Sequence, residues 1–280
     1  MEIMNNEKNE SAGMRFLYNT AIGRAALRIV VSSFVSVSVG AFMSCRLSKP
    51  MIKRFVRKNG IDMSEYEDEK YRCFNDFFIR RIKPEKRPFD ISPDALVAPC
   101  DGCLSVYKID GGTVLPVKQS LYTIRDLLDG DEIAKIYDGG YCLVFRLTVK
   151  NYHRYAYTAD GRKNGNTHIK GVFHTVRPIA LAGYPVFVRN TREYTTVDTE
   201  AFGRITQVEV GAALVGKIKN LHGEKAVARG EEKGMFMFGG STVIQLIEPE
   251  KVRLDDKYES AVGSGAEIPV LMGERIGGRI

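Results

Sequence analysis

The segment Thr242-Val-Ile-Gln-Leu-Ile247 is a run of β-branched and aliphatic residues, a composition that favours a strand. Two further runs of this kind are Tyr141-Cys-Leu-Val-Phe-Arg-Leu147 and Ile205-Thr-Gln-Val-Glu-Val210. In the second part of the chain such runs alternate with Gly, Asp and Asn, which favour turns. We therefore predict a mostly antiparallel β domain over residues 91–280, with an irregular glycine-rich tail from Gly263.

The chain before residue 91 has a different pattern. Apolar residues at helical spacing predict helices over residues 14–58, with an interruption near Cys45 to Pro50. Residues 62–90 are predicted to form a second helical element. Together the two parts predict an α+β fold in which residues 1–90 form a separate N-terminal helical region.

Basic residues are concentrated near the N-terminus. There is no acidic residue between Ser11 and Ile61, and nine basic residues in this segment exceed the chain's net charge of +7. These are Arg15, Arg24, Arg28, Arg46, Lys49, Lys53, Arg54, Arg57 and Lys58. Such a cluster binds phosphates in lipid or in nucleic acid, but the chain has none of the usual motifs that combine aromatic and basic residues to bind RNA. We expect no nucleic-acid partner.

The same region has features of a membrane-surface segment. In Met51 to Lys58, Ile52, Phe55 and Val56 occur at helical spacing with cations between them. Such a helix can lie among lipid headgroups with its apolar face toward the lipid; the alternative is a basic helix packed on its own domain. Ile29 to Cys45 is apolar but serine-rich, and it is shorter than the ~20 apolar residues that cross a bilayer. We expect helices that associate with an anionic membrane without spanning it.

The cysteines indicate a reducing compartment. Their number is five, which is odd, and no secretory leader precedes them. Cys100 and Cys103 enclose Asp101-Gly102, which favours a turn, and no second ligand pair follows at zinc-site spacing. No H-E-x-x-H motif is present either, so we expect no metal. The protein is therefore predicted to lie peripherally on the cytoplasmic face of the cell membrane.

Four segments, taken in order, carry a family resemblance. They are Phe74-Asn-Asp-Phe-Phe-Ile-Arg80 with Lys83-Pro84 and Arg87-Pro88, then Ala98-Pro-Cys-Asp-Gly102, then Lys150-Asn-Tyr-His-Arg154 with Gly171-Val-Phe-His-Thr-Val-Arg-Pro178, and Gly234-Met-Phe-Met-Phe-Gly-Gly-Ser-Thr242. In this order and spacing the chain resembles the pyruvoyl-dependent phosphatidylserine decarboxylases, in particular the shorter bacterial branch. Each motif alone is weak, and Gly-Gly-Ser-Thr by itself would indicate only a turn before a strand.

The resemblance implies self-cleavage between Gly240 and Ser241. Residues 1–240 would form the beta chain and residues 241–280 the alpha chain, with Ser241 converted to a covalent pyruvoyl cofactor. Gly239 and Gly240 lack Cβ and so allow close approach to the backbone. The strand that begins at Thr242 would hold the cofactor in place.

The resemblance also implies a base for the serine, which is a weak nucleophile at neutral pH. Asp101 and His153 match the acid and the histidine of a relay to Ser241. Many family members have a second histidine three residues after the first, where this chain has Ala156. If that residue is the processing base elsewhere, His153 must perform both tasks here, or His174 or His168 must replace it.

The implied reaction is the decarboxylation of phosphatidylserine to phosphatidylethanolamine and CO2 through a Schiff base to the pyruvoyl group. A homodimer is expected. Three alternatives stay open on the sequence: a pyruvoyl decarboxylase of another amine such as a free amino acid, an uncleaved serine hydrolase with the same three residues, and a non-enzymatic module that binds anionic lipid or nucleic acid.

Overall fold

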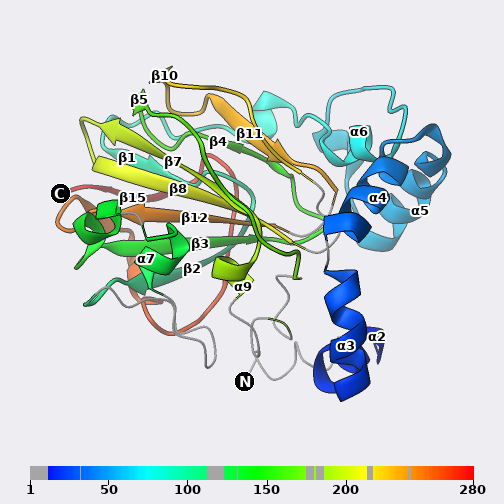
Figure 1. Cartoon of the computed structure of the whole chain (residues 1–280). Coiled ribbons are helices and arrows are strands. Elements are labelled where there is room, and N and C mark those ends of the chain that lie inside the picture. Colours follow the sequence, from blue (N-terminus) through cyan, green and yellow to red (C-terminus); the bar gives the residue numbers. More distant parts are fainter. Residues whose placement is uncertain are drawn as a thin grey trace.

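Helices precede strands along the chain in the computed structural model, which describes residues 12–31, 33–111, 123–130, 132–174, 180, 186–212, 217–238 and 241–280 (Figure 1). The N-terminal helices are α2 (Ala12–Asn19), α3 (Ala21–Val30), α4 (Ser33–Met43), α5 (Met51–Asn59) and α6 (Phe74–Phe78). The predicted interruption between Cys45 and Pro50 is confirmed, and it contains the 3-10 turn η1 (Arg46–Ser48). None of the described helices is long and apolar enough to cross a membrane.

A nine-stranded antiparallel sheet dominates the described remainder of the chain. Its strand order is β10-β5-β7-β8-β12-β3-β2-β14, with β6 also paired to β7. In chain order its strands are β2 (Gly102–Lys108), β3 (Tyr141–Leu147), β5 (Gly161–Lys163), β6 (Thr167–Ile169), β7 (Arg192–Thr199), β8 (Gly203–Gly211), β10 (Lys225–Val227), β12 (Ser241–Ile247) and β14 (Ile268–Val270). The predicted α+β fold with mostly antiparallel strands is confirmed.

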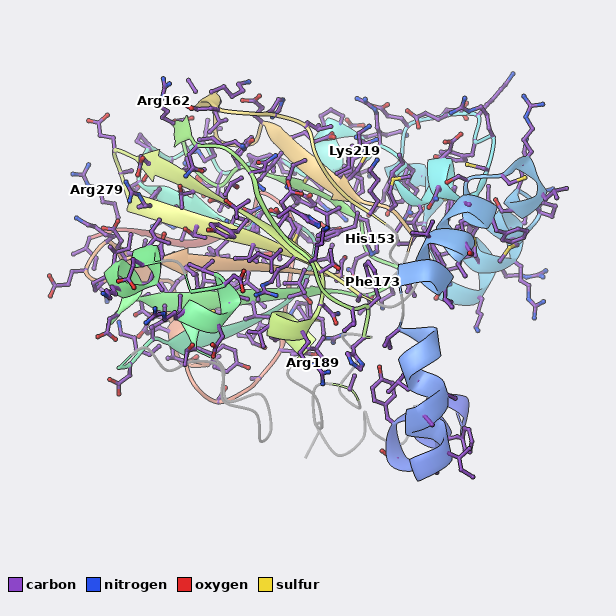
Figure 2. The ribbon with its side chains drawn as sticks, viewed as in Figure 1. His153, Arg162, Phe173, Arg189, Lys219 and Arg279 are labelled. Atoms are coloured by element: carbon purple, nitrogen blue, oxygen red, sulfur yellow. The ribbon has the colours of Figure 1, made fainter. Side chains whose placement is uncertain are left out.

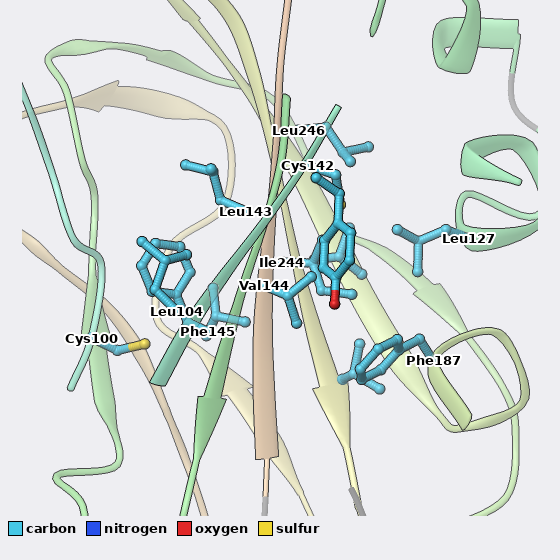
Figure 3. Packing of buried hydrophobic residues seen from close by; sticks show 14 of the residues in the cluster. Cys100, Leu104, Leu127, Cys142, Leu143, Val144, Phe145, Phe187, Ile244 and Leu246 are labelled. Carbon is cyan, nitrogen blue, oxygen red and sulfur yellow. The ribbon is translucent and has the colours of Figure 1, made fainter. Parts of the chain in front are cut away.

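The strand β12 lies inside this sheet and is buried along its whole length. It pairs with β3 on one side and with β8 on the other, from Ser241 to Ile247 in both cases. Its alternate side chains enter two apolar layers. Figure 3 shows one layer with Cys142, Val144, Ile244 and Leu246 facing Leu127 and Phe187, and the other with Cys100, Leu104, Leu143 and Phe145. Because both faces are buried and mostly apolar, the run does not alternate between apolar and polar residues, and its polar members Thr242 and Gln245 are buried as well.

Two three-stranded sheets flank the main one. One contains β1 (Ala95–Val97), β15 (Arg275–Arg279) and β13 (Val252–Leu254), and the other β4 (Arg154–Ala156), β11 (Glu232–Phe236) and β9 (Ile218–Asn220). The prediction of an irregular tail from Gly263 was wrong, because β14 and β15 lie in it. Two of the tail's glycines, Gly277 and Gly278, belong to the strand β15 itself, where Gly277 approaches Arg253 O so closely that a Cβ would clash.

Short helices cover the face of the main sheet that contacts Leu127 and Phe187. They are α7 (Ile124–Leu127), η4 (Glu132–Tyr137) and α9 (Val186–Arg189), and α10 (Asp256–Glu259) follows β13. The predicted helical element over residues 62–90 is largely absent. It contains η2 (Met63–Glu65), the five-residue α6 and η3 (Pro84–Lys86). Pro84 and Pro88 prevent a longer helix only at the end of this segment.

The helix α5 corrects a second expectation. Ile52, Phe55 and Val56 were predicted to face lipid, but they pack on the phenylalanines of α6. The Phe55 ring lies edge-on to Phe74, with ring centroids 5.1 Å apart. These three residues of α5 are thus partly buried inside the protein, as the alternative interpretation had it, while Met51 and the cations of the helix are exposed. Whether residues 1–90 are a domain of their own stays a prediction.

An aromatic cluster joins the helical region to the end of β11. Phe74 and Phe78 on α6 contact the ring of Phe238 at 4.9 and 5.2 Å between centroids. The backbone N–H of Phe238 also donates to the side chain of Asn75, at 2.9 Å. The segment that leads to Gly239 and Gly240 is therefore anchored to α6.

We expect β12 to contribute strongly to stability. Ile244 is fully buried, so Ile244→Ala should lower the free energy of unfolding by about 2–5 kcal/mol. Ile91 is 88% exposed, and Ile91→Ala should change it by less than about 0.5 kcal/mol. Urea unfolding of both variants measures the difference. Each variant also carries Ser241→Ala, so that only the uncleaved chain is present. Equal losses would contradict a central role for β12.

Candidate active site

The site forms where one end of the main sheet meets the helical region. Ser241 at the start of β12 is opposite Leu147 at the end of β3 and Gly211 at the end of β8. Cys103 of β2 and Thr242 are both opposite Arg146, so β2 starts at this same end. Two strand spacings place the start of β2 about 10 Å from the start of β12. Asp101 immediately precedes β2, and His153 follows β3 by a short loop.

Ser241, the predicted nucleophile, is enclosed at the start of β12. Its side chain is fully buried, and its Oγ has no hydrogen-bond partner among the described residues. A buried hydroxyl without a partner costs about 1–3 kcal/mol, so such an atom calls for an explanation. A nucleophile that must attack the neighbouring peptide carbonyl supplies one. Gly239 and Gly240, the other residues of the predicted cleavage site, lie outside the described residues.

Asp101 is buried in a tight ionic contact. The guanidinium of Arg87 donates from Nε to Oδ1 and from Nη2 to Oδ2, each at 2.8 Å. The backbone N–H of Met272 donates to Oδ1 at 2.9 Å. Within the described structure none of the hydrogen bonds of this carboxylate goes to His153, and the relay implied by the resemblance stays a prediction. Asp101 instead connects the predicted beta and alpha chains.

His153 is fully buried between β4 and α6. Its ring lies 4.1 Å from the ring of Phe78, and its backbone carbonyl accepts from Phe236 N–H at the end of β11. Figure 2 shows it between the sheet and the N-terminal helices. Its Nδ1 lies 2.8 Å from Asn151 O. Because a carbonyl only accepts, Nδ1 carries the hydrogen, and Nε2 is the nitrogen with the basic lone pair.

His174 is linked to the partner strand of Ser241. The side chain of Asn190 accepts from His174 N–H at 2.9 Å and donates to His174 O at 2.8 Å. The same amide donates to Gly211 O at 2.7 Å, and Gly211 is paired with Ser241. Burial, and to a smaller extent the positive charge of Arg189, lowers the pKa of His174 to about 4. His174 is therefore neutral at pH 7 and a weak base.

The other predicted site residues are placed differently. His168 is half exposed on β6, 3.8 Å from Glu193, and no described contact links it to Ser241. Thr242 is fully buried, and its side chain points to the opposite face of β12 from Ser241. In the described part of the chain no three His, Cys, Asp or Glu residues form a group that could hold a metal.

A buried ion pair anchors β11, the strand before the predicted cleavage site. Lys233 Nζ donates to Glu209 Oε1 at 2.6 Å, and both side chains are fully buried. Asn220 and Gln207 complete the hydrogen bonds of the pair. Since Glu209 is opposite Val243, the pair fixes β11 over the strands that carry Ser241.

Three residues of the site were not predicted. Arg87 lies in a motif that the sequence analysis quoted, but its pairing with Asp101 depends on the tertiary fold. Phe78 was likewise quoted without a role. Nothing in the sequence singles out Asn190, because a buried asparagine clamp depends on which carbonyls the fold brings near it.

Comparisons with known proteins agree on one family. The family profile described as phosphatidylserine decarboxylase matches residues 74–278. The phosphatidylserine decarboxylase proenzyme 2 of Clostridium acetobutylicum is 40% identical over 99% of this chain and 95% of its own length. The phosphatidylserine decarboxylase proenzyme of Clostridium botulinum is 38% identical over 96% of this chain and 94% of its own length. That of Ruminiclostridium cellulolyticum is 38% identical over 93% of this chain and 89% of its own length.

The environment of His174 predicts a pH effect on stability. Its pKa of about 4 in the folded chain lies below the ordinary 6.5, so the unfolded chain takes up a proton first as the pH falls. The folded state should lose up to about 3 kcal/mol between pH 6.5 and 4 from this residue. His174→Gln should remove that part of the loss. Urea unfolding at pH 7 and 4.5, again with Ser241→Ala, measures it; an unchanged pH dependence would contradict the assignment.

Proposed function

Because the chain belongs to the phosphatidylserine decarboxylase family, we propose that it converts phosphatidylserine to phosphatidylethanolamine and CO2 with a pyruvoyl group made from its own Ser241. The observation that carries this proposal is the state of Ser241. Its hydroxyl is buried, lacks a hydrogen-bond partner in the described structure, and starts the most enclosed strand of the sheet.

Maturation requires that Ser241 Oγ attack the carbonyl of Gly240. The bond from Oγ to that carbon forms, the peptide C–N bond breaks to leave an ester, and a base carries the serine proton to the nitrogen that becomes an amine. Loss of the Ser241 α-proton then eliminates the Gly240 carboxylate and cuts the chain, and hydrolysis of the resulting dehydroalanine releases ammonia and leaves the pyruvoyl group. We assign this base to Nε2 of His153, because the hydrogen on Nδ1 is held by Asn151 O. The ring is fixed by Phe78, which also contacts Phe238 in the segment before the cleavage site.

Asp101 serves as a positioning residue in this proposal. It holds Arg87 on one side and the backbone of Met272 on the other, so it ties the beta chain to the alpha chain beside the cleaved bond. A direct hydrogen bond to His153 would require Asp101 to release one of these partners. His174 and His168 are weaker candidates for the base, one for its low pKa and the other for its exposed position.

The buried start of β12 also suits the cofactor. When formed, the pyruvoyl group supplies an electron-withdrawing carbonyl that takes up the electrons left by CO2. The chain keeps that position dry, because Ser241 and its strand partners Leu147 and Gly211 are enclosed. After cleavage β12 stays in place, because its pairing with β3 and β8 does not depend on the broken bond.

Membrane association is proposed through the outer surface of residues 42–58. Phe42, Leu47 and Met51 are exposed there, at 46%, 76% and 40%. They are surrounded along the chain by exposed cations, namely Arg46, Lys49, Lys53, Arg54, Arg57 and Lys58. Apolar side chains flanked by cations suit an anionic bilayer surface. All five cysteines are free, which fits the cytoplasmic face, and the homodimer stays a prediction.

Activity on lipid tests the function directly. We expect wild-type protein to release CO2 from phosphatidylserine in mixed micelles, and Ser241→Ala to release none. Free serine should be a much poorer substrate, because it lacks the lipid portion. Turnover by Ser241→Ala, or a preference for free serine, would contradict the proposal.

The role of His153 can be tested on self-cleavage. His153→Gln should slow the appearance of fragments 1–240 and 241–280 by at least about 100-fold, since general-base catalysis contributes 10²–10⁴. Asp101→Asn should slow it less. The matched control is His222→Gln, because His222 contacts Tyr157 and Glu231 away from Ser241. Pulse-chase labelling and denaturing gels give the rates; a wild-type rate for His153→Gln would contradict the assignment.

The membrane surface predicts a charge effect. Lys53, Arg54, Arg57 and Lys58 changed together to Glu should weaken binding to phosphatidylserine vesicles by at least about 100-fold, at about 1 kcal/mol per lost cation. The control variant reverses four exposed cations elsewhere: Arg125, Lys135, Arg162 and Arg253. Vesicle sedimentation measures both. Equal losses would show that net charge, not this surface, determines binding.

A further inference from the structure

Arg80 differs from the other buried cations in the described structure. Arg87, Arg154 and Lys233 each form an ion pair with a carboxylate. Two more donate to several carbonyl or amide oxygens, namely Lys163 and Arg192. Arg80 is fully buried, yet no described carboxylate lies within ion-pair distance of it. A buried charge without a counter-ion is costly unless a ligand supplies one.

The contacts of Arg80 leave part of its guanidinium unused. It stacks over the rings of Tyr66 at 4.1 Å and Phe77 at 4.8 Å. Its Nη2 donates to the Tyr66 hydroxyl at 3.0 Å, while its contacts to Phe77 O and Lys150 O are long, at 3.4 and 3.5 Å. Its Nε has no hydrogen-bond partner in the described structure. The aromatic rings therefore hold the group in place without neutralising it.

A second unused donor lies in the same cluster. The Tyr71 hydroxyl is buried and has no hydrogen-bond partner among the described residues. Its ring lies 5.6 Å from that of Phe77, on which Arg80 also stacks. Burial raises the pKa of Tyr71, so the hydroxyl keeps its proton and can only donate to an anion.

This cluster adjoins the proposed catalytic residues. Arg80 contacts the carbonyl of Lys150 in the loop that ends at His153. Phe78, two residues before Arg80 in the chain, lies against the ring of His153 and against the ring of Phe238.

We propose that Arg80 and Tyr71 form the subsite for the phosphodiester of the lipid headgroup. This inference rests on the proposed function and extends it to substrate recognition. The phosphate is the better fit than the serine carboxylate, because a cation on the carboxylate would stabilise the ground state and oppose loss of CO2. The phosphate keeps its charge throughout the reaction, so a buried guanidinium can hold it without opposing the chemistry.

The test uses mature enzyme and soluble dihexanoyl phosphatidylserine, so that vesicle binding plays no part. Tyr71→Phe should raise KM about tenfold and Arg80→Gln about 100-fold or more, with kcat changed less than about threefold. Both variants should self-cleave at the wild-type rate. Tyr107→Phe, which alters a buried tyrosine on β2, is the matched control and should leave KM unchanged.

Two further arms separate the possible outcomes. O-butylserine keeps the amine and carboxylate but lacks the phosphate, so any turnover of it should be equal in wild type and variants. Inhibition by inorganic phosphate tests which ligand the site binds. If the variants lose this inhibition but keep a KM for the lipid within twofold of wild type, the site binds free phosphate. That result would overturn the headgroup proposal.

The proposal is also overturned if Tyr71→Phe keeps a wild-type KM, even when Arg80→Gln fails to mature. A fall in kcat alone would mean that Arg80 only supports the His153 loop. The proposed function is judged separately, because it fails only if wild-type enzyme does not turn over phosphatidylserine at all.

Discussion

The pairing of β12 with β3 and β8 is the constraint on which the rest of the structure depends. A serine that must react with its own backbone needs a fixed position and a dry environment. The first residue of a strand that is hydrogen-bonded on both edges and covered on both faces has both. The same pairing allows the peptide bond before Ser241 to break without loss of the fold, because non-covalent contacts hold the strand on every side.

Antiparallel order then brings the chemical groups together. Since β12 and β2 start where β3 and β8 end, Asp101, the His153 loop and Asn190 all reach the same end of the sheet. Buried charged side chains lie around that end, and they differ in whether an opposite charge neutralises them. Asp101 is neutralised by Arg87, and Glu209 by Lys233, whereas Arg80 in the aromatic cluster is not. The compensated pairs hold the framework, and Arg80, whose Nε lacks a partner in the described structure, is the buried cation that we propose for a ligand.

The sequence predicted those parts that depend on local pattern. Runs rich in β-branched and aliphatic residues identified β3, β8 and β12, because a strand buried on both faces is mostly apolar. The polar residues inside these runs, such as Gln245 and Glu209, are buried too. The order of four short motifs identified the family. The tail strands β14 and β15 were missed, since their short runs contain proline and glycines and are strands only through pairing with β2 and β1. Likewise, the pattern of α5 showed that it has an apolar face but not what covers that face.

The sequence named candidate residues for the site but not their contacts. Ser241, His153 and Asp101 were named from motifs, yet the partner of Asp101 depends on where residues far apart in sequence meet. The central claim is the chemical state of residue 241, and intact mass of purified wild-type protein measures it most directly. We predict a C-terminal fragment of residues 241–280 that is lighter by one ammonia than its sequence, has no free amino terminus and reacts with hydrazides. A single uncut chain, or a fragment that starts with an ordinary serine amine, would contradict the account.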